Sequence, residues 1–129
     1  MFMIRRIARD QRAHLRAIAK LYRRFSEENT SEARGLRLLR SWLSEQQREQ
    51  FDTKGYFDVV GCHSGTRYRI RYGTAMNVHE LDEADNFRIG WCFVPDGSLV
   101  AGDVMLAQKI ALETSERSAL KVAKRFLSR

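Results

Sequence analysis

One segment of the chain places arginines and apolar residues in strict alternation. If it forms a strand, one face carries Arg67, Arg69 and Arg71 and the other carries aromatic and aliphatic side chains. Three guanidinium groups at this spacing span roughly 13 Å, enough to follow two or three phosphates of one nucleic-acid strand. The alternative is that these arginines pair across the sheet with Asp58 and Glu80. The segment therefore predicts either nucleic-acid contact or cross-strand ion pairing.

A second series of cations follows helical spacing near the N-terminus. These residues form the basic stripe, which comprises Arg5, Arg9, Arg12, Arg16, Lys20 and Arg23. A neighbouring stripe is apolar and includes Ile4, Leu15 and Ile18. Such a helix is marginally stable alone, so its apolar side must dock on the rest of the chain, on a protein partner or on a second copy. The basic stripe itself predicts contact with phosphates.

The overall charge supports a surface that faces a polyanion. The net charge is +7, from 23 Lys and Arg against 16 Asp and Glu, and the two ends of the chain are basic whereas the middle is mildly acidic. Charge asymmetry of this kind is typical of nucleic-acid contact. The alternative is that these cations are only the solvated faces of amphipathic helices.

Four residues are candidate metal ligands or nucleophiles, namely Cys62, His63, His79 and Cys92. Zinc ligands commonly pair at short spacings, and an adjacent Cys-His followed by distant single residues matches no such signature. On a strand, Cys62 and His63 would point to opposite faces unless a turn rotates them. We predict no metal and no cofactor.

Catalysis would need a nucleophile beside a base. Cys62 with His79 is the pair that the strands could bring together. The sequence contains no Gly-x-Ser-x-Gly motif, no phosphate-cradling glycine loop and no His-Glu-x-x-His motif. We therefore predict no catalytic residue and keep a Cys62-dependent enzyme as an alternative.

Hydrophobic periodicity predicts an α+β fold of N-terminal helices, a four-stranded antiparallel meander and C-terminal helices. A long helix covers residues 1–25, a second begins at a cap on Thr30 or Ser31, and a third begins at a capping box on Ser44. The strands are expected at 56–61, 67–72, 75–81 and 87–94, with a turn at 95–98. A last helical region follows, with Asp103 as its N-cap, a bend near Thr114 or Ser115 and a final amphipathic stretch at 120–127.

Length and composition favour one domain. The 129 residues are 43% apolar, which argues against disorder. Residues 1–54 are expected as a helical extension, and residues 55–129 as the meander with the C-terminal helices. No stretch approaches the ~20 apolar residues of a membrane span, and charges interrupt the first 25 residues too often for a secretory signal. With only two cysteines, a cytoplasmic protein is expected.

Four short runs resemble a family of small uncharacterised bacterial proteins. They are Gly-Thr-Arg-Tyr-Arg-Ile at 65–70, Asn-Val at 77–78, Cys-Phe-Val-Pro at 92–95 and Gly-Asp-Val-Met-Leu-Ala-Gln-Lys at 102–109. The last run is the most distinctive, and the N-terminal third of the chain lies outside the resemblance. The resemblance implies a bacterial origin and carries no activity, cofactor or site residue.

The predicted function is therefore a non-enzymatic basic domain that binds nucleic acid or acts in regulation. Its contacts would come from Arg67, Arg69, Arg71 and the basic stripe. The alternative is a protein-interaction module or a homodimer formed through the N-terminal helix. The nucleic-acid prediction depends on the two cationic series meeting in one solvent-facing patch, and it does not choose between DNA and RNA.

Overall fold

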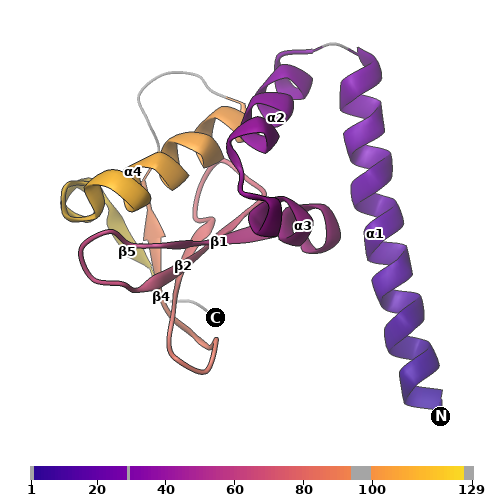
Figure 1. The fold of residues 1–129 in the computed structure, drawn as a ribbon, viewed down its shortest axis with the longest axis horizontal. Coiled ribbons are helices and arrows are strands. Elements are labelled where there is room, and N and C mark those ends of the chain that lie inside the picture. Colours follow the sequence, from indigo (N-terminus) through magenta and orange to yellow (C-terminus); the bar gives the residue numbers. More distant parts are fainter. Residues whose placement is uncertain (1, 29, 94–99, 127–129) are drawn as a thin grey trace.

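The computed structural model describes the backbone of residues 2–28, 30–93 and 100–126, and the side chains of residues 10–23, 30–93 and 100–126. Helices and strands follow one another along the chain as three helices, four strands, a long helix and a short strand (Figure 1). The helices are α1 Phe2–Glu28, α2 Ser31–Trp42, α3 Glu45–Lys54 and α4 Ala101–Val122. The strands are β1 Tyr56–Val60, β2 Arg67–Arg71, β3 Val78–Leu81, β4 Phe87–Cys92 and β5 Lys124–Phe126.

The two short N-terminal helices begin where capping predicts. The Thr30 side chain accepts a hydrogen bond from the Ala33 N–H at the start of α2. At the start of α3, Ser44 and Gln47 form a capping box in which each side chain bonds the other's backbone N–H. Helix α3 ends at Gly55, whose φ of 77° is in the left-handed region that glycine adopts at low cost. These caps confirm the sequence prediction for both helix starts.

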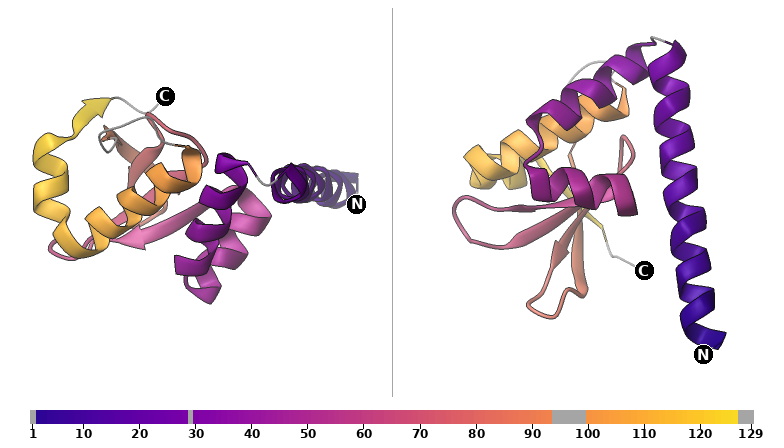
Figure 2. Two further views of the ribbon diagram at one scale, coloured as in Figure 1. Left: turned by 90° about the horizontal axis from the view of Figure 1, so that it is seen from above. Right: turned by 45° about the vertical axis from the view of Figure 1, so that its right-hand side comes forward.

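The five strands form one antiparallel sheet in the order β1-β2-β3-β4-β5. In the register of the sheet, Arg69 of β2 lies between Asp58 of β1 and His79 of β3. It also places Tyr68 opposite Glu80, so these two side chains share the face that α4 covers. The helices α2, α3 and α4 all lie on this side of the sheet, and no described helix crosses the other face (Figures 1 and 2).

The core lies between the covered face of the sheet and helices α2, α3 and α4. Its buried members are aliphatic and aromatic side chains from every one of these elements. They are Leu36, Leu39, Leu43, Phe51, Phe57, Val59, Tyr68, Ile70, Val78, Met105, Leu106 and Leu112. Because Tyr68 and Ile70 lie in the core, the three arginines between and beside them lie on the opposite face, as the alternation predicts.

The run at 102–109 has packing roles. A Cβ on Gly102 would lie 2.2 Å from the carbonyl carbon of Gly35, so only glycine lets α2 and α4 approach this closely. Gln108 exchanges two hydrogen bonds with the buried Asn77, of 2.8 and 3.0 Å, and also donates to the Phe93 carbonyl. The most distinctive run in the resemblance therefore supports the helix layer and its junction with β3.

Two features of the sheet differ from the sequence prediction. The sheet has five strands, because the chain after α4 pairs with β4 instead of continuing as a helix to 127. Gly90 makes this pairing possible: a Cβ there would lie 2.1 Å from the Phe126 ring. Strand β3 begins at Val78 and not at 75, since the preceding residues form a turn with a positive φ at Met76. The predicted turn at 95–98 lies outside the described residues.

Helix α4 also differs at its start. Its N-cap is Val100, not Asp103, and no side chain caps the helix there. The predicted bend is confirmed at Ser115, whose φ of −148° and ψ of 46° interrupt the helix. Beyond the bend, the second half of α4 turns toward the edge of the sheet that carries β5 (Figure 2).

Helix α1 stands beside this body and runs past it. Its contacts come from its middle and its C-terminal half: His14 Nε2 donates to the Lys54 carbonyl over 3.0 Å, and the Arg40 guanidinium lies over the Tyr22 ring at 4.9 Å. Its N-terminal turns extend beyond α3 (Figures 1 and 2). At 27 residues the helix is about 40 Å long, so a sizeable part of it lies outside the body.

Candidate functional site

The candidate site is the side of the sheet that no described helix covers, here called the open face. It combines guanidinium groups with aromatic rings. Its members are Tyr56, Asp58, Arg67, Arg69, Arg71, His79, Phe87 and Phe126.

Arg69, at the centre of this face, forms an ion pair with two hydrogen bonds. Its Nε and Nη2 donate to the two carboxylate oxygens of Asp58 over 2.8 and 3.1 Å. Burial alone would raise the pKa of Asp58, but the Arg69 hydrogen bond and charge outweigh it and lower that pKa. The predicted cross-strand pairing with Asp58 is therefore confirmed, and most of Arg69's charge is matched.

Arg67 is paired as well, with a different acid from the one expected. It donates to the Asp85 carboxylate in the β3–β4 turn and, more weakly, to the Asp82 carbonyl. Glu80 lies on the covered face, where it accepts a hydrogen bond from the Trp91 indole over 3.2 Å. The partner of Arg67 therefore comes from the β3–β4 turn, which follows the register shift between Glu80 and Leu81.

Arg71 is the exception among the three. In the described part of the chain no carboxylate pairs with it. Its guanidinium carbon lies 4.9 Å from the Phe87 ring centre and 5.2 Å from the Tyr56 ring centre. Cation–π contact leaves the guanidinium N–H groups available to a ligand. Arg71 is thus a cation held between two aromatic rings.

Aromatic contacts extend from Phe87 across the face. The His79 ring lies 4.8 Å from Phe87 in a tilted stack and 5.6 Å from Phe126 edge-on. Phe126 in turn covers Gly90. Burial and the charges of Arg71 and Arg69 lower the pKa of His79, so this ring is neutral at neutral pH. The rings of Phe87, His79 and Phe126 therefore form a row on the open face, and Phe87, at one end of this row, contacts the guanidinium of Arg71.

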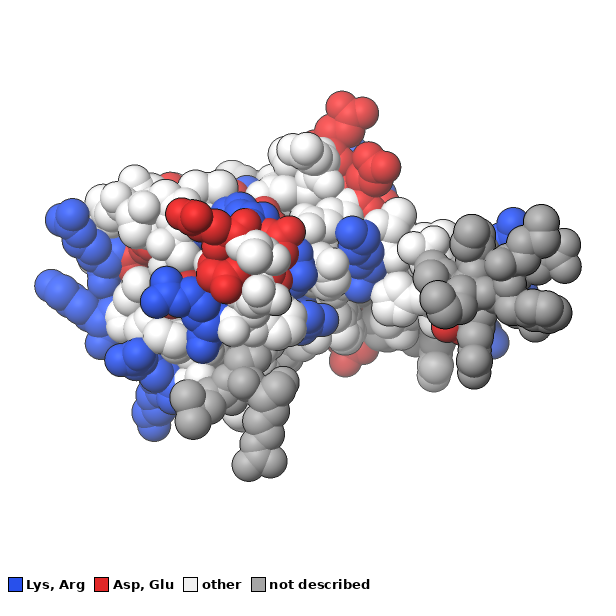
Figure 3. Space-filling model, turned by 90° about the horizontal axis from the view of Figure 1, so that it is seen from below, with Lys and Arg blue, Asp and Glu red and all other residues white. Residues whose placement is uncertain are grey.

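Two shallow grooves meet at Arg67. One, of about 610 Å³, lies between the β1–β2 and β3–β4 turns and includes Arg88 and Glu83. The other, of about 510 Å³, lies between α3 and β1 and includes Lys54 and Glu49. Each groove carries both signs of charge. Seen from this side, the described acidic side chains gather near the centre of the surface with basic side chains next to them, and several more basic side chains gather at the left-hand end (Figure 3).

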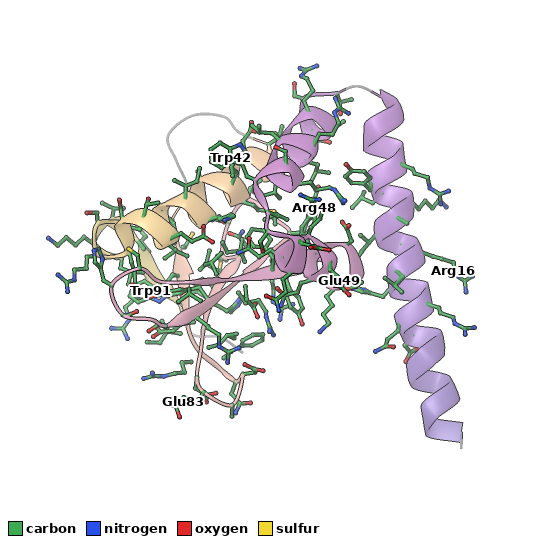
Figure 4. The ribbon with its side chains drawn as sticks, viewed as in Figure 1. Arg16, Trp42, Arg48, Glu49, Glu83 and Trp91 are labelled. Carbon is green, nitrogen blue, oxygen red and sulfur yellow. The ribbon has the colours of Figure 1, made fainter. Side chains whose placement is uncertain are left out.

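The described cations of the basic stripe lie on α1 and not on the sheet. Arg12, Arg16, Lys20 and Arg23 are all exposed on α1, and Arg16 points away from the body (Figure 4). The side chains of Arg5 and Arg9 lie outside the described residues. Among the described residues, the cations of the basic stripe therefore lie on α1, whereas Arg67, Arg69 and Arg71 lie on β2.

Cys62 is near a histidine, but not the one that the sequence favoured. Its Sγ lies 3.6 Å from Nδ1 of His63, in the turn after β1. His79 instead packs against Phe87 and Phe126 on the open face. The proposed Cys62–His79 pair is thus not formed.

Sequence reasoning missed Glu116, the most strongly hydrogen-bonded charge in the described structure. This carboxylate is 1% exposed and accepts hydrogen bonds from the His63 and Ser64 N–H groups and from the Ser64 and Tyr68 hydroxyls. Burial alone would raise its pKa, but these four donors hold it at about 2. No sequence signal marks Glu116 except its position beside the predicted bend in α4.

No protein-family model, no curated protein and no solved structure matches the chain. Among the described residues, no helix combines the length and the apolar character needed to cross a bilayer. The site must therefore be interpreted from its own geometry.

Proposed function

We propose that the protein binds single-stranded nucleic acid on the open face. The observation that carries this proposal is Arg71, whose guanidinium contacts the rings of Tyr56 and Phe87 and pairs with no carboxylate of the described residues. Bases stack on aromatic rings and on guanidinium planes, and a neighbouring cation contacts the phosphate between two stacked bases. The open face supplies both groups side by side, without a helix over them.

The geometry favours a single strand over a duplex. Duplex bases are stacked on one another, so they cannot lie on protein rings without being unpaired. Duplex binding depends mainly on many phosphate contacts. Here Arg67 and Arg69 already pair with Asp85 and Asp58, which reduces their attraction for phosphate. Stacking, not charge density, is therefore expected to supply most of the affinity.

The test is fluorescence anisotropy with labelled single-stranded RNA, single-stranded DNA and duplex DNA at several salt concentrations. Phe87→Ala is expected to weaken single-strand binding about tenfold, since stacking contributes about 1–3 kcal/mol per base. Trp42→Ala is the matched control, because Trp42 is an exposed aromatic on α2, away from the open face. Arg71→Gln is compared with Arg117→Gln, which removes the same charge from an exposed position on α4.

The result expected is a loss with Phe87→Ala and Arg71→Gln and little change with either control. Each phosphate contact that remains adds about 0.7 to the slope of log affinity against log salt. Since Arg67 and Arg69 of β2 already pair with Asp85 and Asp58, we expect a shallow slope. Equal losses in Arg71→Gln and Arg117→Gln would mean that only net charge matters, and tighter binding of duplex would contradict the stacking mechanism.

Helix α1 supports a second candidate function, self-association. Leu15 and Leu21 are each 38% exposed although they lie on the apolar side of α1, and the helix extends beyond the body. A second copy would cover this apolar surface. Leu15→Glu is expected to convert a dimer to a monomer in light scattering, whereas Leu38→Glu, at an exposed leucine of α2, is expected to leave the mass unchanged. A wild-type monomer at high concentration would contradict this candidate.

A further inference from the structure

The turn after β1 rotates two neighbouring side chains toward each other. Cys62 and His63 would diverge on a strand, but both lie in the turn and both are exposed. Cys62 Sγ and His63 Nδ1 are 3.6 Å apart. Together with a carboxylate oxygen of Glu116, all three ligand atoms lie within 4.8 Å of one another. Thiolate, imidazole and carboxylate are the three ligand types that Zn²⁺ uses in proteins.

The distance between sulfur and nitrogen matches a shared metal. With a Zn–S bond of about 2.3 Å and a Zn–N bond of about 2.0 Å at a tetrahedral angle, the two ligand atoms lie about 3.5 Å apart. The observed separation of 3.6 Å is almost this value. The carboxylate would be reached by rotation of the exposed side chains of Cys62 and His63, while their backbone N–H groups keep their hydrogen bonds to Leu112 and Glu116.

His63 is in the form that binds a metal through Nδ1. The Arg117 backbone N–H donates to Nδ1 over 3.3 Å. A backbone N–H cannot accept, so Nδ1 carries a lone pair and the ring proton is on Nε2. A metal would take the place of this long hydrogen bond, and the Arg117 N–H is at the first turn after the bend in α4, where it can bond water instead.

Glu116 fixes the negative charge of the site. Its four hydrogen bonds and its burial hold the carboxylate immobile. Gly61 allows this placement, because a Cβ there would lie 2.2 Å from a Glu116 oxygen. Since the four donors use the lone pairs of the carboxylate, direct coordination requires one of them, such as the Ser64 hydroxyl, to turn away. The negative charge of the Glu116 carboxylate favours binding of a divalent cation at this site.

We propose that Cys62, His63 and Glu116 bind one Zn²⁺ ion in each chain, with water as the fourth ligand. On binding, Cys62 loses its thiol proton to solvent as the sulfur–zinc bond forms. Three protein ligands and one open position are typical of zinc sites that exchange a ligand. The proposal is independent of nucleic-acid binding, since none of the three residues lies on the open face.

The experiment titrates ZnCl₂ into the reduced full-length protein by calorimetry and repeats the titration with Co²⁺ while recording absorbance. A site with a stoichiometry of one and a thiolate-to-cobalt charge-transfer band is expected. Cys62→Ser is expected to remove the band, and His63→Gln to weaken Zn²⁺ binding at least tenfold. The matched controls are Cys92→Ser and His14→Gln, which alter the other cysteine and a histidine on α1 and are expected to bind as the wild type does.

Three outcomes would overturn the proposal. One is Zn²⁺ binding that survives Cys62→Ser unchanged, and another is a cobalt complex without thiolate absorption. The third is a stoichiometry of one half accompanied by doubling of the mass in light scattering, because two chains would then share the ion. Circular dichroism of both site variants confirms that they are folded; since Cys62 and His63 are exposed, neither substitution disturbs the core.

Discussion

The two faces of the sheet carry their charges in opposite ways. On the covered face, Glu116 is buried and has four hydrogen-bond donors. On the open face, Arg67 pairs with Asp85 and Arg69 pairs with Asp58. In the described residues, Arg71 contacts aromatic rings and no carboxylate. A charge taken out of water must have all its hydrogen bonds made within the protein, whereas a charge at the surface retains capacity for a ligand.

This difference predicts that loss of the Glu116 charge mainly lowers stability, whereas loss of the Arg71 charge mainly lowers affinity for nucleic acid. Glu116 joins the β1–β2 turn to the bend in α4, two segments more than 50 residues apart in sequence. Arg71 joins no distant segments by an ion pair in the described residues. Removing the Glu116 charge should therefore destabilise the fold, and removing the Arg71 charge should change only affinity.

The largest effect is expected for Glu116→Gln. The amide keeps the volume but turns an NH₂ group toward donors that need an acceptor, so buried N–H and hydroxyl groups lose partners. We expect the free energy of unfolding to fall by about 3 kcal/mol, measured by urea denaturation. Asp85→Asn, at an exposed ion pair, is the control and is expected to change stability by less than about 0.5 kcal/mol. Similar losses in the two variants would remove the contrast between the faces.

The stabilising effect of Glu116 is also expected to depend on pH. The ordinary pKa of Glu116 is 4.5 and its folded value is about 2, so its stabilising effect is complete above pH 4.5 and is lost as pH falls from 4.5 toward 2. The integrated effect is about 3 kcal/mol. The difference in unfolding free energy between the wild type and Glu116→Gln should therefore shrink between pH 6 and pH 3. A difference that stays constant over this range would show that the carboxylate charge is not its source.

A smaller effect is expected for Asp58→Asn. Asp58 and Arg69 are less exposed than the Arg67–Asp85 pair, with 19% and 14% of their side chains accessible. Loss of the carboxylate leaves Arg69 half-buried without an anion, for which we expect a cost of about 1–2 kcal/mol. Thermal unfolding near neutral pH measures it. Because the pKa of Asp58 is lowered by Arg69, this contribution should also fade as pH drops toward the folded pKa.

The smallest effect is expected for Asp85→Asn on affinity. It frees the Arg67 guanidinium, which then contacts phosphate, and we expect single-strand binding to become a few-fold tighter. Anisotropy with the same oligonucleotides measures the change. Glu45→Gln is a matched control, since it removes one exposed acid from the start of α3. Weaker binding in Asp85→Asn would show that the β3–β4 turn itself contributes to the interface.

Local sequence signals determined most of the α+β order and several of its boundaries. Thr30 and Ser44 cap the helices that follow them, and the break at Ser115 lies where the helical pattern fails. These features depend on residues within three or four positions of one another. The alternation in β2 likewise separates Tyr68 from Arg69 by a property of the strand alone.

Tertiary structure decided what those elements do. Three contacts come from segments that are distant along the chain. Asp85 pairs with Arg67, Glu116 lies beside Cys62 and His63, and Phe126 packs over Gly90. The direction of Arg16, away from the body, depends on how α1 packs on α2 and α3. Periodicity assigns a side chain to a face, because backbone geometry repeats locally. Which distant group meets that face depends on how the whole chain packs, and no local pattern contains that information.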